Sequence, residues 1–188
     1  SLNKYNFTLD NNKLTLTQNN NKILTINIDE TGEYELLSNK ILELESSLQK
    51  PISLMKNMDI PFFDTSISNK TVLTHSISLI NNQSIEDFKN KTNQEIETQR
   101  FRGNIFVEGI EAWEERNWIG KIIKINNISF KVEKNIPRCV AINLKPNSND
   151  NSLNLLQALK KNYNHFDMGV YLTALDDGLI NIGDNISL

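Results

Sequence analysis

The feature that most constrains the fold is an alternation of apolar and polar residues with a period of two, in short runs separated by turn residues. In residues 1–35 the apolar members of these runs are Tyr5, Phe7, Leu9, Leu14, Leu16, Ile23, Leu24, Ile26 and Ile28. Asparagines interrupt the runs at Asn11-Asn12 and at Asn19-Asn20-Asn21. Because successive side chains of a strand point to opposite faces, the pattern predicts a meander of short antiparallel strands.

The rest of the chain repeats short strand patterns and adds a few helices. The further predicted strands are 74–80, 101–107, 122–125, 128–132, 139–144, 170–175 and 179–182. Asn126-Asn127 and Asp176-Asp177-Gly178 are the turn residues of two predicted hairpins. Many short strands with few helices predict a mainly β (α+β) domain that resembles a β-barrel.

Three segments have the features of helices. A helical period of apolar residues predicts one over 34–49, with Ser38 as a candidate cap and Pro51 beyond its end, and another over 153–163. Ser84, with Asp87 three residues on, predicts the start of the third. The segment 59–69 is predicted to be a loop between two subdomains.

Charge and cysteine content exclude several classes of protein. The net charge is −3, and the basic residues are scattered, which argues against a nucleic-acid-binding surface. The apolar stretches are too short to span a bilayer, and no secretory signal opens the chain. A single cysteine excludes an internal disulfide and an iron–sulfur cluster held by this chain alone. We therefore expect a cytoplasmic protein that binds neither nucleic acid nor membrane.

Cys139 is the first candidate for chemistry because of its neighbours. It follows Pro137 and Arg138 where a loop enters a predicted strand. A guanidinium next to a thiol favours the thiolate, which is the reactive form. A free cysteine is, however, more often a small buried residue of the core. Both interpretations are open from the local sequence.

Arg100, Arg102 and Asn104 are the second candidate group. At positions i, i+2 and i+4 of the predicted strand they would lie on one face. Such a polar row is costly to bury unless it binds an anion or a carboxylate. The alternative is an exposed strand face with acidic neighbours. His75, His165 and the pair Glu114-Glu115 form no recognisable motif, and both histidines are interpreted as structural.

These residues occur in an order that resembles the MOSC domain family, the C-terminal domain of molybdenum cofactor sulfurases. Residues 100–105 (Arg-Phe-Arg-Gly-Asn-Ile) are similar to the Arg-Phe-Arg-x-Asn-Ile strand of that family. Other similar segments are 76–88, 107–109, 114–120, 138–139, 143–146, 165–171 and 180–184. Residues 165–171 resemble the His-x-Asp-x-Gly-Val-Tyr strand of an alphaproteobacterial-type subgroup.

The resemblance implies a domain organisation. Residues 61–188 correspond to the MOSC domain, and residues 1–60 to the later part of the β-rich subdomain that precedes it. The Pro-x-Lys-Ser and Gly-x-x-x-Asp-Arg elements of that subdomain have no counterpart here. Two further positions depart from the family pattern. Amidoxime-reducing members carry a further cysteine near the position of Ile136, and Lys145 is the second departure.

The resemblance also implies a site around Cys139, which would bind molybdenum or carry sulfur as a persulfide. Arg102 and Asn104 would hold the pterin phosphate or oxygens of a molybdenum cofactor, supported by Arg100. Arg138 would stabilise the thiolate. The floor of the pocket would comprise Asp167 and Tyr171, and His75 lies in a segment that lines it in relatives.

Three functions follow from the resemblance. The first is a molybdenum-cofactor-binding reductase of N- or S-oxygenated compounds, which would receive electrons from a separate protein. The second is a persulfide carrier supplied by a cysteine desulfurase, and the third is a scaffold with an inert cysteine. Pyridoxal phosphate binding is also ascribed to the family. Whether the chain is itself an enzyme stays open.

Overall fold

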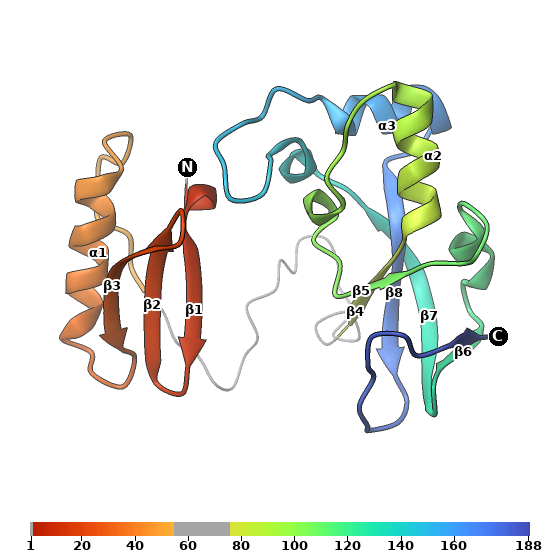
Figure 1. Ribbon diagram of the computed structural model, residues 1–188, viewed down its shortest axis with the longest axis horizontal. Coiled ribbons are helices and arrows are strands. Elements are labelled where there is room, and N and C mark those ends of the chain that lie inside the picture. The colour runs from red at the N-terminus through yellow and green to blue at the C-terminus, as the bar shows by residue number, and fades with distance from the viewer. Residues whose placement is uncertain (1, 55–75) are drawn as a thin grey trace. The chain divides into compact units, whose positions relative to one another are not determined.

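The computed structural model describes residues 2–54 and 76–188 and divides into two compact units (Figure 1). Within the described residues, unit 1 comprises 2–54 and 145–150, and unit 2 comprises 76–144 and 151–188. The predicted loop 59–69, the start of the predicted strand 74–80, His75 and the boundary at residue 60 lie outside the described residues. No helix in the described part of the chain is both long and apolar enough to cross a membrane.

Unit 1 contains the predicted meander. Strands β1 (Asn6–Asp10), β2 (Lys13–Gln18) and β3 (Asn21–Asn27) form an antiparallel sheet in the order β1-β2-β3. Asn11, Asn19 and Asn20 have positive φ in the two turns, a conformation that asparagine tolerates better than most residues. A short 3₁₀ helix, η1 (Leu2–Lys4), precedes the sheet.

Helix α1 (Glu33–Leu44) packs on the sheet of unit 1. Leu37 and Ile41 of the helix form a core with Leu16 and Ile26 of the strands. The predicted cap at Ser38 is wrong, because the helix begins five residues earlier, after Gly32. Ser38 lies inside the helix, and its hydroxyl donates to the carbonyl of Ile52.

Unit 2 is built on a six-stranded sheet that curls into a nearly closed, barrel-like shape, which confirms the predicted fold class. Its order is β5-β4-β8-β7-β6-β9. The strands are β4 (Ile77–Asn81), β5 (Ile105–Val107), β6 (Ile122–Ile125), β7 (Ile128–Pro137), β8 (Asp167–Ala174) and β9 (Ile186–Ser187). Among these described strands, β4 and β5 pair in parallel and the other neighbours pair antiparallel. Register shifts between β7 and β8 supply the bends that curvature needs.

Two hydrophobic cores lie in unit 2. One is formed by strand residues such as Leu79, Phe130 and Leu172. The other joins the sheet to helices α2 (Asn82–Thr92) and α3 (Leu155–Tyr163), which lie together in Figure 1. The predicted start of α2 at Ser84 is wrong, because Asn81 is the N-cap and accepts a hydrogen bond from the backbone N–H of Gln83.

One glycine marks a close approach of two strands. Gly169 on β8 has a φ of 80°, and a Cβ at this position would lie 2.4 Å from the carbonyl oxygen of Leu79 on β4. The predicted strand 179–182 is not formed, and the segment that follows β8 is irregular up to β9. Instead of closing a hairpin with residues 179–182, β8 pairs with β4 and β7. Asp176 accepts a hydrogen bond from the N–H of Ser129 at 2.9 Å.

Candidate functional site

Cys139 lies just beyond the end of β7 with an exposed side chain. Its backbone is extended, and it precedes the 3₁₀ helix η5 (Val140–Asn143) as the N-cap residue. The predicted strand 139–144 is therefore wrong: the chain turns here, and the carbonyl of Cys139 accepts a bond from Ile142 N–H at 3.2 Å. The exposed position does not agree with the interpretation of Cys139 as a packed core residue.

Arg138 is partly buried and is held by backbone carbonyls. Its Nε donates to the carbonyl of Met168 at 2.9 Å, Nη2 donates to the same oxygen, and Nη1 donates to the carbonyl of Phe101 at 2.8 Å. Burial lowers the pKa of Arg138 to about 10, and the nearby Tyr171, Cys139 and Asp167 oppose that lowering. The guanidinium therefore stays charged at neutral pH in surroundings poor in water.

Arg100 is buried and bonded to groups within the protein. Residues 98–101 form the 3₁₀ helix η3 (Thr98–Phe101), so the predicted strand 101–107 is reduced to β5 and its common polar face is wrong. The Arg100 side chain is 2% exposed. Its Nε lies 2.6 Å from Glu97 Oε2, and its Nη1 donates to the carbonyl of Asn143 at 2.7 Å.

Arg102 is exposed and caps η3 with a left-handed backbone, φ 47°. Its Nη1 donates to the carbonyl of Ala141 at 2.8 Å and to that of Arg100 at 3.2 Å. The two arginines thus fix two carbonyls of η5 from a segment about forty residues away in sequence. The loop after Cys139 is held by side chains and not by strand pairing.

Asn104 is occupied by an internal contact. Its Oδ1 accepts from the N–H of Ser78 at 2.9 Å and from the Ser78 hydroxyl at 2.7 Å. Its own N–H donates to the Ser78 hydroxyl at 2.9 Å. These bonds tie the start of β5 to β4, and they leave only the amide nitrogen of Asn104 for any ligand.

Asp167 and Tyr171 lie on β8, near Arg138. Asp167 Oδ2 is 3.4 Å from Arg116 Nη1, and the Asp167 N–H donates to His165 Nδ1 at 3.1 Å. Burial lowers the pKa of His165, which favours the neutral imidazole that this bond requires. Tyr171 is partly buried, and Lys134 Nζ lies 6.0 Å from its ring centroid.

The structure therefore brings Cys139, Arg102 and Arg138 to one loop region, whereas Arg100 is buried and the side-chain oxygen of the exposed Asn104 is bonded to Ser78. In the described part of the chain no carboxylate lies within ion-pair distance of Arg102 or Arg138. Residues 2–54 and 76–188 contain no group of three His, Cys, Asp or Glu side chains that would hold a metal ion.

A buried carboxylate network was missed from the sequence. Glu115 is fully buried and accepts from Asn81 Nδ2 at 2.9 Å and from Ser84 Oγ at 3.0 Å. Burial raises the pKa of Glu115. It lies in the 3₁₀ helix η4 (Glu114–Trp118) and ties this helix to the start of α2. The adjacent Glu114-Glu115 pair was visible in the sequence, but nothing local distinguished the buried member.

A second missed cluster surrounds Asp87. Its Oδ2 accepts from Trp113 Nε1 at 2.7 Å, Tyr163 OH at 2.8 Å and Lys91 Nζ at 3.2 Å. Hydrogen bonds from Trp113, Tyr163 and Lys91 lower the pKa of Asp87 against the opposing effect of burial. The ring of His165 stacks on Tyr163 with centroids 5.8 Å apart. All these polar groups have partners, so the cluster joins α2 to α3 and is structural.

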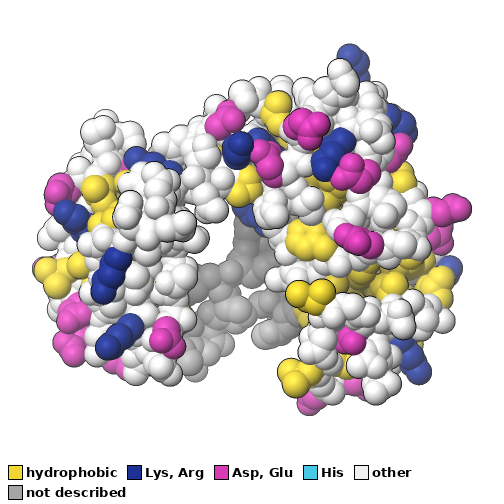
Figure 2. All heavy atoms as spheres, in the orientation of Figure 1, with side chains coloured by type: hydrophobic (Ala, Val, Ile, Leu, Met, Phe, Trp, Pro, Cys, Tyr) yellow, Lys and Arg dark blue, Asp and Glu magenta, His cyan; other side chains and the backbone are white. Residues whose placement is uncertain are grey.

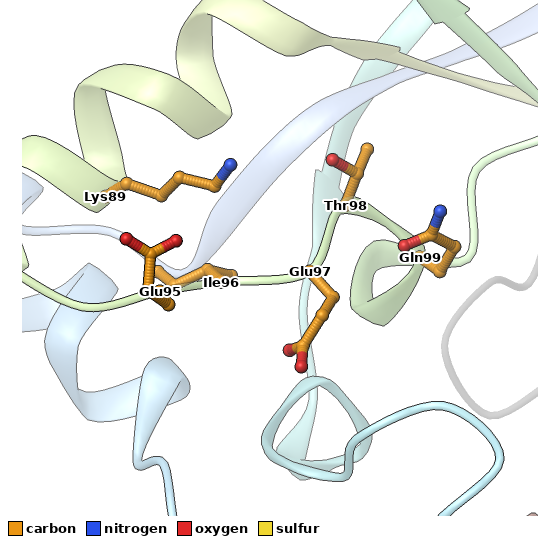
Figure 3. Close-up of a pocket in the computed structure, with 6 residues that line it drawn as sticks. All are labelled: Lys89, Glu95, Ile96, Glu97, Thr98 and Gln99. Atoms are coloured by element: carbon orange, nitrogen blue, oxygen red, sulfur yellow. The ribbon is translucent and has the colours of Figure 1, made fainter.

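A hollow of about 440 Å³ lies beside the segment that leads into Arg100 (Figure 3). It is lined by Lys89, Glu95, Ile96, Glu97, Thr98 and Gln99. Lys89 on α2 faces this segment, whereas Glu97 points to the other side. No predicted site residue lines it. On the visible face of unit 2, Figure 2 shows basic and acidic side chains interspersed, with no continuous basic band.

Comparison with known proteins finds similarity to a domain family and to a larger protein. The model of the MOSC domain family matches residues 65–187, which is more than half of the chain. The molybdenum cofactor sulfurase of Bombyx mori is 30% identical over 92 residues, which make up 48% of this chain and 11% of that protein. The chain therefore corresponds to a small part of this relative's length.

Proposed function

Because this chain belongs to the MOSC domain family, we propose that it handles sulfur at Cys139, as a carrier of persulfide for a metal–sulfur cofactor. The observation that supports this function is an exposed thiol in the same loop region as Arg138 and Arg102, two cations without a carboxylate partner among the described residues. The similarity to a molybdenum cofactor sulfurase is consistent with sulfur transfer towards that cofactor.

The transfer step needs only a nucleophilic sulfur and a positive surrounding. The Cys139 thiolate attacks the outer sulfur of a donor persulfide, the S–S bond of the donor breaks, and the donor cysteine leaves as a thiolate. Cys139 then carries the sulfur as a persulfide, with no net oxidation or reduction. A thiolate or persulfide anion is stabilised by a nearby guanidinium whose position is fixed before the reaction. Arg138, held by Met168 and Phe101, meets that condition.

A second candidate function is binding of the molybdenum cofactor in a reductase of N- or S-oxygenated compounds. Cys139 is a suitable soft ligand for molybdenum, and Arg102 keeps free guanidinium donors for anionic groups of the pterin. When bound, the cofactor would supply the oxygen-atom removal. The other two expected anchors fit less well, because Arg100 is engaged with Glu97 and Asn143, and Asn104 with Ser78. The carrier function is therefore the better supported of the two.

Mass spectrometry tests the carrier function directly. The full chain is incubated with a cysteine desulfurase and free cysteine, and the intact mass is measured under non-reducing conditions. We expect a gain of one sulfur atom that a reductant removes. Since the chain has one cysteine, the site follows from the mass alone, and Cys139→Ser is the matched control.

Two outcomes would overturn this function. One is absence of added sulfur on the wild-type chain while a known acceptor in the same reaction is modified. The other is stoichiometric molybdenum and pterin on chain expressed with ample molybdate, with Cys139 unreactive in that state. The second result would instead support the cofactor-binding reductase.

A further inference from the structure

The surface next to the thiol exposes apolar side chains. Val140, which follows Cys139, is 70% exposed, and Phe166 is 38% exposed. The two segments are adjacent, because the N–H of Arg138 donates to the carbonyl of Phe166 at 2.9 Å. Val140 and Phe166 therefore add exposed apolar surface on the two segments that meet beside the thiol.

Two cations lie on or beside the segments that carry these apolar side chains. Lys160 Nζ lies 5.6 Å from the centroid of the Phe166 ring. Arg102 is exposed, and its side chain contacts the carbonyl of Ala141, next to Val140. Asp167, which follows Phe166 in the chain, is paired with Arg116. We call Arg102, Cys139, Val140, Lys160 and Phe166 the Cys139 rim. It is positive, although the whole chain has a net charge of −3.

We infer that the Cys139 rim docks an acidic, partly apolar surface of the protein that donates sulfur to Cys139. This inference rests on the proposed function and adds the chemistry of the partner. Opposite charge speeds the encounter and orients the two surfaces, and apolar contact with Val140 and Phe166 holds the donor sulfur near the thiol. A small persulfide would need neither apolar side chain.

An anionic membrane is the competing occupant of a basic and apolar surface. Stable attachment to lipid takes a longer amphipathic element, a cluster of several basic residues or an acyl chain. The Cys139 rim offers two apolar side chains on separate short segments. A protein surface of matching size is therefore the occupant that the geometry favours.

Thiol–disulfide exchange with designed peptides tests the inference. Two peptides each carry one cysteine as a mixed disulfide with thionitrobenzoate, and in both the cysteine is flanked by leucine. The acidic peptide also contains aspartate and glutamate, and the basic peptide contains lysine instead. Release of thionitrobenzoate by the full chain is measured at low and high ionic strength. Each rate is divided by the rate at which free N-acetylcysteine releases thionitrobenzoate from the same peptide. We expect the acidic peptide to react about tenfold faster at low salt, and this preference to shrink at high salt.

Two neighbouring lysines of α3 provide a matched pair of variants. Lys160→Gln removes the cation over Phe166 and should reduce the preference for the acidic peptide severalfold. Lys161→Gln removes the same charge from the next exposed residue, which points about 100° around the helix, and should leave the preference nearly unchanged. Val140→Ser should slow both leucine-containing peptides alike. Circular dichroism confirms that each variant is folded.

Equal normalised rates for the two peptides, or an unchanged preference in Lys160→Gln, would overturn the inference. Cosedimentation with vesicles of phosphatidylserine and phosphatidylcholine, lost in Lys160→Gln, would also overturn it in favour of a membrane. Failure of the proposed function gives a different result, since the acidic preference would persist while no persulfide forms. Exchange with peptides measures docking without requiring sulfur transfer.

Discussion

The Arg138 guanidinium donates three hydrogen bonds to the carbonyls of Met168 and Phe101. Replacing this residue removes these donors, and each buried acceptor that loses its partner costs about 1–3 kcal/mol. We expect Arg138→Met to lower the free energy of unfolding by about 2–4 kcal/mol, as measured by urea denaturation. It should also slow the reaction of Cys139 with anionic thiol reagents under native conditions.

Arg102→Met is the control for that prediction. Arg102 is exposed, and water can replace it at the carbonyl of Ala141, so we expect a loss below about 1 kcal/mol. Equal losses in the two variants would show that Arg138 is not fixed by its backbone partners as described.

Glu115 affects how the free energy of unfolding of unit 2 depends on pH. Burial raises its pKa above the ordinary 4.5. As the pH rises past 4.5, the unfolded chain therefore loses this proton first, and the free energy of unfolding falls until the pH passes the raised pKa. We expect urea denaturation of Glu115→Gln to show a smaller fall, or a steeper rise, of stability between pH 4.5 and 7 than the wild type.

The comparison isolates Glu115 because the other titrating groups are common to both proteins. Asp87 and Asp176, whose pKa values are lowered, act in the opposite sense and cancel in the difference. A Glu115→Gln variant with the wild-type slope would contradict the assignment of a buried, ionising Glu115.

At the scale of elements, the contact of β4 with β8 depends on Gly169. An added Cβ would lie 2.4 Å from the Leu79 carbonyl, and the φ of 80° disfavours any side chain. We expect Gly169→Ala to cost about 3 kcal/mol or more, from a backbone clash added to about 1–2 kcal/mol of strain. Gly120 has a φ of 81°, and a Cβ there meets no described atom within 4 Å. Thermal or urea denaturation of Gly120→Ala should therefore show the strain alone, and equal losses would refute the close approach.

Elements with local signals were predictable from the sequence. The strands of unit 1 follow from alternation and from asparagines that adopt positive φ at the turns. Helix α3 follows from its apolar period. By contrast, η3 depends on the burial of Arg100 against Asn143, 43 residues away. The extended pattern of 101–107 contains no sign of that contact, and so the strand was predicted too long.

The candidate site was predictable in part for the same reason. The neighbours of Cys139 in the sequence indicated its centre, and Arg138 and Arg102 lie near it in the structure. Arg100 and Asn104 were predicted to face a ligand because alternation was extended through a turn. Their partners, Glu97 and Ser78, are set by the tertiary fold. The burial of Glu115 was likewise invisible in an acidic pair.

At the scale of the whole molecule, the described residues form separate cores in the two units. The cluster around Leu16 and Ile41 contains no residue of unit 2. Separate cores predict separate cooperative transitions. Both tryptophans, Trp113 and Trp118, belong to unit 2, so their fluorescence reports its unfolding alone. We expect urea curves from tryptophan fluorescence and far-ultraviolet circular dichroism not to coincide, and a single shared midpoint would contradict separate transitions.

The bonds from Arg100 and Arg102 to the carbonyls of η5 have a consequence for how MOSC domains can be recombined. Residues 97–102 and 139–143 are distant in the chain, yet each fixes the conformation of the other. A chimera that exchanges only one of these segments for that of a relative removes hydrogen-bond partners from the other. Either a buried guanidinium or an exposed loop then lacks the groups that hold it. The two segments must therefore be exchanged together if the Cys139 thiol is to keep its position.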